Sequence, residues 1–473
     1  MSNPSRLDRP DRPSRCNRSC HIGSRVRRST LVLLLALILG LMPAAALVWP
    51  TPAAAQESDA AQERAAEQQA EEADPVPVLR AIEIKGNERT SANVVRREIG
   101  LEPGDPFPEE LVDPIWDRLE DLGYFAFVDL TYDEVEPGEV ILRVVVEEER
   151  ALGYGPVLRY SDRHKYLMGG WVRDRNFRGE GEIVEAQIVT YRIQQLTLGW
   201  TRPWFLGVPG LSLAARTGAE QGDFVWRATD YSTWRSDLET AWRIRGPFFA
   251  EASGGYRVYH QRESFTAPPV DRGDATVAGP VLHPEHTRRS WILGGGVGLD
   301  ARNNPFYPTS GAYGRLGGRW VAGDNFDSFG EWSGDLRLFV PIRDDLVLAL
   351  RGYGVLVTDP QPIEDRLYWG GAESIRGHDR ASVEGENGYL LTAEIRVPLF
   401  LMPISPEGEL VGFGLHAFAD AGDAWYEGDE SGTAVHGWGL GVHLNVAAAQ
   451  FRFEAANDGE GDWAFQFTDR FNF

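Results

Sequence analysis

The residue types and spacing best suited to a functional site are found in Trp369–Arg380, WGGAESIRGHDR, which lies between two strand-like runs. Its three glycines allow sharp backbone turns, and Arg376 directly precedes Gly377. A guanidinium presented from such a partly apolar turn needs carboxylate partners if it is buried. Glu394 in TAEIRVP and Asp420 in FADAG stand on the strand-like runs that follow. We therefore predict a loop folded back into a barrel, with Arg376, Gly377, Asp420 and Glu394 as its anchor.

The alternative for this arginine is a position at the loop surface, where an ion pair is worth under about 1 kcal/mol. The flanking glycines and the two carboxylates favour the buried pair. The sequence contains no G-x-S-x-G, H-E-x-x-H or phosphate-loop motif. The two histidines of HPEH, His283 and His286, lie in a polar loop without further ligands. We therefore expect no enzymatic activity, no cofactor and no metal site.

Composition favours a β-rich protein with a small and a large domain. The chain has 473 residues and a formal net charge of −23, which argues against nucleic acid as a partner. Aromatic residues make up 11%, and there are 52 glycines but only 4 methionines, as is typical of barrels with aromatic girdles. The two cysteines, Cys16 and Cys20, precede the expected cleavage site. A disulfide framework in the mature chain is therefore excluded.

The N-terminal region reads as a targeting segment followed by a linker. Arginines precede the apolar run LVLLLALILGLM, and three alanines precede Gln56, which together predict a secretory signal over residues 1–55. The apolar run is roughly a dozen residues long, short of the ~20 that a membrane-spanning helix needs. The alternative is an uncleaved anchor. Residues 56–77 are rich in Ala, Glu and Gln and are interpreted as an acidic linker.

Residues 78–149 have the pattern of a small α+β domain. The expected elements, in order, are a strand over 78–84, a helix from Thr90 or Ser91 to 99, a helix over 108–123, and strands over 125–132 and 140–147. This β-α-α-β-β order, with KGNERT, LGYFAFVDL and LRVVVEE in sequence, resembles a POTRA domain. The alternative is an unrelated α+β spacer.

From residue 150 onward the pattern predicts an all-β transmembrane barrel. In Trp438–Val446, apolar residues alternate with Gly, His and Asn, as a strand between lipid and a wet lumen requires. A soluble sandwich would bury the second face as well. We count about sixteen antiparallel strands, near 151–161, 165–176, 181–192, 195–204, 208–221, 231–245, 249–262, 288–301, 311–321, 330–341, 345–357, 388–398, 409–421, 435–447, 449–456 and 463–472.

Three motifs in this half resemble the BamA/TamA superfamily of outer-membrane assembly and translocation proteins. SIRGH (374–378) resembles its V/I-R-G-F/Y loop signature, with His378 in place of the aromatic residue, and FADAGDAW (418–425) resembles its F-x-D-x-G strand motif. LDARNNPFYPTSGAY (299–313) resembles its D-x-R-x-x-x-F-x-P-T-x-G hairpin. The matching hairpin residues are Asp300, Arg302, Phe306, Pro308, Thr309 and Gly311. The C-terminal Phe471 and Phe473 correspond to the family's assembly signal.

The resemblance implies a role for each anchor residue. Arg376 corresponds to the family's loop arginine, Asp420 to its strand carboxylate, and Glu394 to a second acidic partner. It also implies a non-enzymatic factor in the outer membrane of a Gram-negative-type bacterium, with the POTRA-like domain in the periplasm. Its expected partners are unfolded outer-membrane or secreted client proteins, outer-membrane lipid, and periplasmic chaperones or accessory subunits.

Client handling is expected at two places. The POTRA-like sheet offers an edge for β-augmentation. The first barrel strand, with Gly153, Gly155 and Pro156, is expected to pair with the last, near 463–472, at a lateral seam that lacks some ladder bonds. The alternatives are a passive outer-membrane channel, or a surface antigen without assembly activity.

Overall fold

The structure is a computed structural model that describes residues 76–161, 165–224, 229–262, 264–265, 282–283, 285–343, 345–404, 409–429, 432, 434–447 and 449–469. The predicted signal over 1–55, all but the end of the predicted linker, and the predicted assembly signal at Phe471 and Phe473 lie outside these residues.

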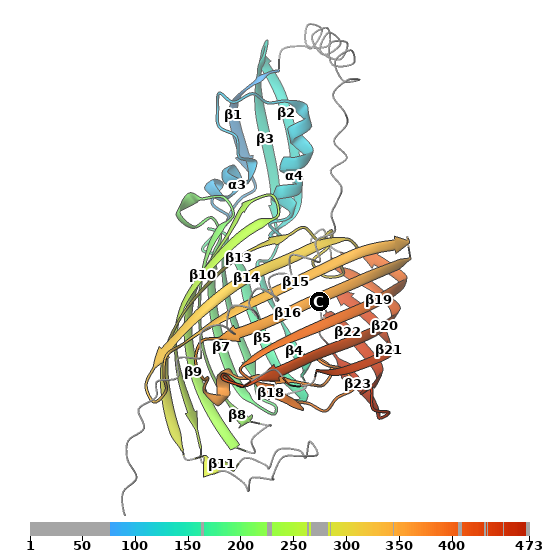
Figure 1. The fold of residues 1–473 in the computed structure, drawn as a ribbon. Helices are drawn as coiled ribbons and strands as arrows, with labels where there is room; N and C mark the ends of the chain where they lie inside the picture. Colours follow the sequence, from blue (N-terminus) through green and yellow to red (C-terminus); the bar gives the residue numbers. More distant parts are fainter. Residues whose placement is uncertain are drawn as a thin grey trace, which may run out of the picture. The chain divides into compact units, whose positions relative to one another are not determined.

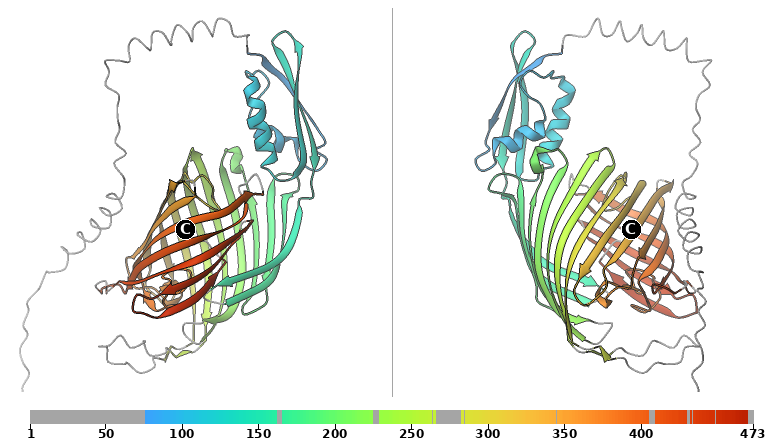
Figure 2. Two further views of the ribbon diagram at one scale, coloured as in Figure 1. Left: turned by 90° about the vertical axis from the view of Figure 1, so that its right-hand side faces the viewer. Right: turned by 60° about the vertical axis from the view of Figure 1, so that its left-hand side comes forward.

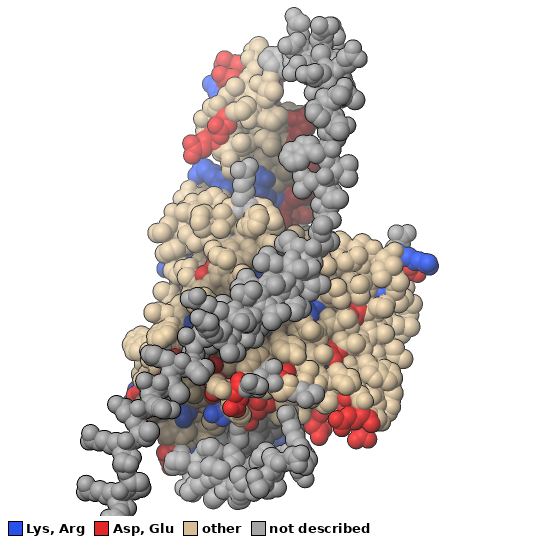
Figure 3. Space-filling model, viewed as in Figure 1, with Lys and Arg blue, Asp and Glu red and all other residues tan. Residues whose placement is uncertain are grey.

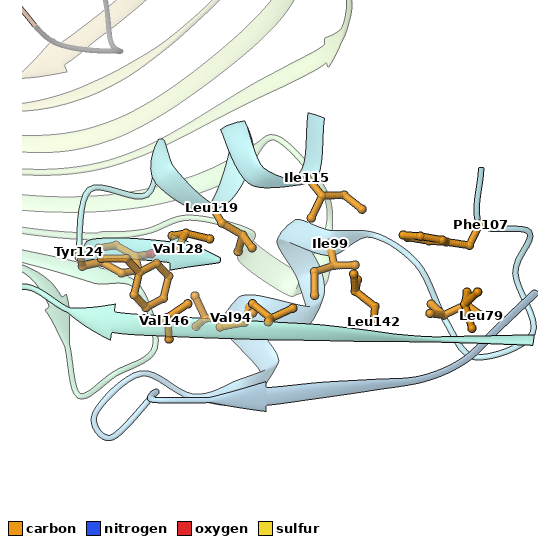
Figure 4. Close-up of a cluster of buried hydrophobic side chains, with 14 residues drawn as sticks. Leu79, Val94, Ile99, Phe107, Ile115, Leu119, Tyr124, Val128, Leu142 and Val146 are labelled. Atoms are coloured by element: carbon orange, nitrogen blue, oxygen red, sulfur yellow. The ribbon is translucent and has the colours of Figure 1, made fainter. Parts of the chain in front are cut away.

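The first part of the described chain is a three-stranded sheet with two helices on one face (Figures 1 and 4). Its elements are β1 (Val78–Lys85), α3 (Ala92–Ile99), the 3-10 turn η1 (Glu109–Leu111), α4 (Val112–Glu120), β2 (Phe125–Glu136) and β3 (Glu139–Glu148). The sheet order is β1-β3-β2, with β1 parallel and β2 antiparallel to β3. The predicted β-α-α-β-β order is confirmed. Among the described residues, none of the helices combines the length and apolar character needed to cross a membrane.

The core of this domain lies between the helices and the sheet (Figure 4). Ile115 and Leu119 of α4, Val94 of α3 and Leu142 of β3 are at most 1% exposed. Full burial of a side chain of this size contributes about 1.5–3 kcal/mol. These residues stand at helical or alternating spacing in the sequence, so the pattern that predicted the elements also forms the core.

Local chemistry sets where the two helices begin and end. The Ser91 hydroxyl caps α3 by accepting a hydrogen bond from the Asn93 N–H at 3.3 Å, and Gly100 ends the helix in a left-handed conformation. The second helix is shorter than the predicted 108–123. Pro114 has no N–H, so an α-helix starting at Glu109 would lose an interior hydrogen bond. The α-helical part therefore starts at Val112, which places Pro114 in the first turn.

Most of the described chain after this domain forms one antiparallel sheet of sixteen strands rolled into a barrel (Figures 1 and 2). The predicted fold class is confirmed. Each strand pairs with its neighbour along the sheet, from β23 at one edge to β4 at the other. The strands are β4 (Leu152–Ser161), β5 (Lys165–Phe177), β6 (Glu182–Val189), β7 (Gln194–Arg202), β8 (Leu211–Phe224), β9 (Thr229–Arg245), β10 (Phe248–Gln261), β13 (His286–Asp300), β14 (Gly311–Gly323), β15 (Phe329–Arg343), β16 (Leu346–Val357), β19 (Asn387–Pro403), β20 (Leu410–Trp425), β21 (Val435–Ala447), β22 (Ala449–Asn457) and β23 (Trp463–Thr468).

The outer face of the barrel is apolar. On β13, Trp291, Leu293 and Val297 are about 60% exposed (65%, 63% and 59%), while the alternating Ser290 and Ile292 are 1% and 9% exposed. Figure 3 shows one face on which the barrel wall carries few charged residues and Asp and Glu gather at one end. Exposed aromatic and aliphatic side chains on this scale are characteristic of a surface that contacts lipid.

A buried polar contact joins the POTRA-like domain to the barrel. The Asn176 side chain at the end of β5 donates to the Thr90 hydroxyl at 2.8 Å, and both residues are 2% exposed. Glu148 accepts hydrogen bonds from the Thr90 and Arg89 N–H groups at 2.6 and 2.9 Å. Burial alone would raise the pKa of the Glu148 carboxyl, but these bonds and the Arg89 charge lower it overall. Arg89 also forms an ion pair with Asp174 of β5 at 2.5 Å.

The predicted seam lies between the two edge strands, β4 and β23. They share no ladder of backbone hydrogen bonds in the residues that the structure describes. They meet near the end of β4, where the Tyr160 N–H donates to Asp469 at 2.9 Å and its ring contacts Phe467. The predicted seam residues Gly153 and Gly155 lie elsewhere on β4.

These two glycines serve packing within the sheet. A Cβ on Gly155 would lie 3.0 Å from the Trp171 indole of β5, and one on Gly153 would lie 3.4 Å from it. Pro156 pairs with Gly170 of β5, and as a residue of an edge strand it removes no ladder bond on its other side. In the described residues this stretch of β4 is paired with β5 alone, so the role of Gly153, Gly155 and Pro156 at the seam stays a prediction.

Candidate functional site

A long loop, residues 358–386, connects β16 to β19. It contains the 3-10 turn η3 (Ile363–Asp365) and a two-stranded hairpin of β17 (Leu367–Trp369) and β18 (Val383–Gly385). Trp369, Ile375 and Val383 of the loop are at most 7% exposed and pack with Ala424 of β20. The loop therefore has its own apolar core against the inner wall and presents the SIRGH segment from a fixed support.

Arg376 is 0% exposed and contacts three carboxylates. It binds Asp420 with both ends of its fork, Nε to Oδ2 at 2.6 Å and Nη2 to Oδ1 at 2.9 Å, and its backbone N–H also donates to Oδ2 at 3.2 Å. Nη1 donates to Glu394 at 3.1 Å and to Glu454 at 2.9 Å. The guanidinium carbon lies 3.5 Å from the centroid of the Phe418 ring. Bidentate and cation–π contacts together fix the orientation of the guanidinium as well as its position.

Two further arginines balance the charge around Arg376. Arg452 donates to Glu394 at 2.5 Å and to Glu454 at 3.0 Å, and Arg396 donates to Glu394 at 2.7 Å. Three arginines thus face three carboxylates, and all six residues are at most 3% exposed. Such a cluster adds little net stability, but it strongly penalises any state in which one member is removed. We call these six residues the tip anchor: Arg376, Glu394, Arg396, Asp420, Arg452 and Glu454.

The period of the strands brings these residues together. Glu394 and Arg396 are two apart on β19, and Arg452 and Glu454 are two apart on β22, so each pair faces one side of the sheet. Between them, β21 presents three glycines to the lumen at 437, 439 and 441. A Cβ on Gly437 would overlap the Arg376 carbonyl oxygen. The glycine stripe therefore makes the space in which the loop lies.

Two histidines extend the tip anchor across the lumen. His416 Nε2 lies 2.9 Å from a Glu454 oxygen, and His416 Nδ1 lies 3.2 Å from His443 Nδ1. His443 Nε2 in turn hydrogen-bonds the Tyr307 hydroxyl at 3.0 Å. Tyr307 is 2% exposed and belongs to the turn between β13 and β14. A hydrogen-bonded chain therefore links this turn to the loop arginine through one carboxylate.

The predicted hairpin motif builds the turn that carries Tyr307. Arg302 binds both oxygens of Asp300, at 2.8 and 2.7 Å. The Thr309 N–H donates to Asn303 at 3.0 Å across the turn. Gly311 has φ +101°, and a Cβ there would overlap the Ala301 carbonyl. The motif thus fixes the backbone of the turn.

Residues just after Arg376 contact both edge strands of the barrel. The Gly377 N–H donates to Gln466 of β23 at 3.4 Å, and the Arg380 guanidinium donates to the Tyr160 hydroxyl of β4 at 3.3 Å. His378 contacts the His436 carbonyl at 2.8 Å, where the family signature has an aromatic residue. The loop therefore bridges the gap where the sheet lacks a ladder.

A pocket of about 910 Å³ lies beside this bridge. Its lining combines inward-facing His416 and Glu454 with outward-facing Leu440, Phe453 and Phe465. A pocket lined from both faces of a sheet marks a place where the wall is incomplete. In the described part of the chain, no group of three or more His, Cys, Asp or Glu side chains is placed to hold a metal ion.

The structure brings Arg376, Asp420 and Glu394 together as the sequence suggested, but sequence reasoning missed much of the site. Glu454 and Arg452 were visible only as one face of an alternating strand. In the hairpin, Tyr307, rather than Phe306 or Pro308 of the motif, reaches the histidine pair. Only the proximity of β22 to the loop, which is a tertiary fact, could have identified the third carboxylate.

Comparison with known proteins agrees with this architecture. Residues 176–473 match the Omp85 superfamily domain, and residues 77–149 match the POTRA, or surface antigen variable number repeat, domain. The outer membrane protein assembly factor BamA of Nitratidesulfovibrio vulgaris is 22% identical over 388 residues, which cover 78% of this chain and 44% of that protein. A putative outer membrane protein assembly factor of Treponema pallidum is 26% identical over 214 residues, which cover 40% of this chain and 25% of that protein. The chain thus spans less than half the length of these relatives.

Solved structures share the fold. BamA from Haemophilus ducreyi lacking POTRA domains 1-3 superimposes with a TM-score of 0.65 at 16% identity, covering 83% of this chain and 84% of that one. CdiB from Escherichia coli gives a TM-score of 0.55 at 13% identity, covering 82% and 74%. Barrels of this kind reside in the outer membrane with their POTRA domains in the periplasm. The sequence motifs, the sixteen-stranded barrel and the match over 176–473 together place this chain in the Omp85 superfamily.

Proposed function

We propose that this chain is an outer-membrane assembly or translocation factor that captures client polypeptides with its POTRA domain and handles them at the seam between β4 and β23. The observation that carries this proposal is the bridge over the seam. Gly377 and Arg380, which follow the buried Arg376, contact Gln466 of β23 and Tyr160 of β4. Moving the tip of the loop would therefore change both edges of the sheet at once.

The unpaired edges are suited to a polypeptide client. Edge strands carry unpaired backbone N–H and C=O groups, which pair readily with an added strand. The short β23, Trp463–Thr468, pairs with β22 only over Arg452–Asn457. A client strand that arrives in extended form could thus complete its backbone hydrogen bonds on β23 before it reaches lipid, where unpaired groups cost several kcal/mol each.

The POTRA domain offers a second edge. In the order β1-β3-β2, β2 leaves one side unpaired within the described sheet, whereas the outer side of β1 is partly occupied by the segment 104–107. Phe127 and Val135 on β2 are 54% and 49% exposed, so an added strand would find apolar side chains beside the free backbone. We place this domain in the periplasm and the barrel in the outer membrane of a Gram-negative-type bacterium.

Depletion of the protein, followed by a census of outer-membrane and secreted proteins, tests the proposal. We expect a subset of barrel or secreted proteins to fall in abundance while lipid-anchored proteins are unchanged. A variant lacking residues 78–148 should still reach the membrane. It should be less active there and should reproduce the same losses of barrel or secreted proteins. An unchanged census on depletion, with the protein present only as an open pore in bilayer recordings, would refute the assembly role in favour of a passive channel.

A further inference from the structure

The loop is held to the barrel wall at a second place, eleven residues before Arg376. Asp365, at the end of η3, is bound by both ends of the Arg257 fork, at 3.0 and 2.5 Å, and lies 3.3 Å from Nη1 of Arg319. Its neighbour Glu364 accepts from Arg288 at 2.7 Å. Arg257, Arg288 and Arg319 belong to β10, β13 and β14, none of which contributes to the tip anchor.

These contacts are largely shielded from solvent. The Asp365 side chain is 2% exposed and the Glu364 side chain 5%, against 13% for Arg257 and 16% for Arg288. In this setting an ion pair is screened less than at a surface. The bidentate geometry of Arg257 also fixes the orientation of the Asp365 carboxylate, which a single contact with a lysine would not do.

Apolar packing supports the same attachment. Ile363, next to the acidic pair, is 7% exposed and packs in one cluster with Tyr231 of β9 and Tyr259 of β10, whose rings stack on each other. The Tyr368 hydroxyl donates to the Ile363 carbonyl at 2.9 Å, which ties this turn to β17. The attachment thus combines charge, ring packing and a backbone contact, as a site that sets position requires.

We propose that Glu364 and Asp365 form a base anchor, which holds the loop to β10, β13 and β14 independently of Arg376. The two anchors lie on different strands and share no residue. Along the loop, β17 lies between the base anchor and Arg376, and its pairing with β18, which follows Arg376, stiffens the segment that carries the arginine. Release of the tip anchor would therefore free the SIRGH segment from the seam while the base of the loop stays in the lumen. With the base anchor in place, the tip of the loop would move about a fixed attachment point at Glu364 and Asp365.

Cysteine accessibility can separate the two anchors in the full chain. The only cysteines are Cys16 and Cys20, so their replacement by serine gives a background for single reporters. Ala372→Cys reports on the tip side, because Ala372 is 1% exposed. Pro362→Cys reports on the base, because Pro362 is buried beside Ile363. The readout is the rate of labelling by a water-soluble maleimide on the purified, folded barrel.

Each anchor variant should expose its own reporter. Asp365→Asn should raise labelling at position 362 by on the order of tenfold, since about 1.4 kcal/mol corresponds to a factor of ten, and should leave position 372 within about twofold. Arg376→Ala should do the reverse. Arg257→Lys, which keeps the charge but loses the fork, should raise labelling at 362 by less than Asp365→Asn does.

Arg315→Gln is the matched control. Arg315 lies on β14 and pairs with Glu251 of β10, the same two strands that bind Asp365, and its side-chain hydrogen bonds among the described residues go to Glu251 and Ser333. It should leave both reporters protected.

Two results would overturn the base anchor. One is that Asp365→Asn leaves position 362 protected in a barrel that still shows heat-modifiable migration. The other is that each anchor variant, or the Arg315 control, exposes both reporters equally, which would mean the loop moves as one body or responds to any loss of charge in the wall. Because the readout needs no client, this outcome is separate from that of the depletion experiment.

Discussion

Removal of the Arg376 guanidinium should destabilise the barrel chiefly because it leaves one buried carboxylate, that of Asp420, without its charged partner. In Arg376→Ala, Glu394 and Glu454 would keep Arg452, which lies 2.5 and 3.0 Å from them, whereas Asp420 would lose both bonds of the fork. Among the hydrogen bonds of the described residues, Asp420 would retain the one from the backbone N–H at 3.2 Å. Breaking one partner of a buried pair costs about 3–5 kcal/mol. We expect the lower half of that range, because two of the three carboxylates stay paired.

The same geometry predicts a strong coupling between Arg376 and Asp420. Asp420→Ala would remove the fork and also the acceptor of the backbone bond, and so should cost at least as much as Arg376→Ala. The double variant should cost less than the sum of the two by about 1–3 kcal/mol, as for residues in direct contact. Arg376→Lys should recover only part of the loss, since an ammonium lacks the planar fork.

Urea unfolding of the barrel in lipid vesicles is monitored by heat-modifiable migration and by tryptophan fluorescence. It gives the free energies of unfolding of the unchanged protein, the two single variants and the double variant. Client insertion is measured on the same variants, and membrane targeting serves as the control that should not change. Additivity of the two single effects to within about 0.5 kcal/mol would show that the residues do not interact, and the tip anchor would have to be abandoned.

Three further predictions concern the surroundings of the tip anchor. Gly437→Ala should displace the loop and lower client insertion as Arg376→Ala does, because a Cβ at position 437 overlaps the Arg376 carbonyl. Gly354→Ala should be neutral, because its Cβ would meet only ordinary contacts. Equal client insertion in both alanine variants would contradict the role of the glycine stripe. Tyr307→Phe removes the hydroxyl bonded to the histidine pair and should lower stability by about 0.5–1.5 kcal/mol without affecting targeting, and unchanged urea midpoints would show that the hydrogen-bonded chain is not used. Deletion of Phe473 should lower the amount of barrel in the membrane but leave the melting of inserted protein unchanged, and normal amounts in the membrane fraction would exclude an assembly signal there.

Alternation along the chain was sufficient to predict the barrel and one side of the tip anchor. A strand of period two assigns each residue to a face, so the inward position of Asp420 followed from its place between alanines. The ends of the strands were harder to predict from the sequence. β19 extends to Pro403, beyond the predicted 398, because a register shift between Pro398 and Phe400 lets pairing with β20 continue past the first proline.

Long-range features had no local signal. The acidic pair Glu364–Asp365 lies in a turn-rich segment, and nothing in its spacing indicates the three arginines that meet it from other strands. Glu454 likewise could be assigned to a face but not to a partner. The role of the predicted seam residues depends on tertiary contacts in the same way. Glycine and proline weaken a strand edge, but only the tertiary arrangement shows that Gly155 accommodates Trp171 while Tyr160 makes the contact with β23.

The central claim, that clients are handled at the seam beside the anchored loop, is tested most directly by site-specific photo-crosslinking in cells. A photoreactive residue is placed at Tyr154 of β4 and at Phe465 of β23, which are 75% and 92% exposed, and at Trp332 of β15 as a control that is 65% exposed away from the seam. We predict adducts with unfolded outer-membrane or secreted polypeptides at positions 154 and 465, lost in Arg376→Ala, and none at 332. Adducts of equal yield at all three positions, or none at the seam while clients accumulate normally, would contradict the account.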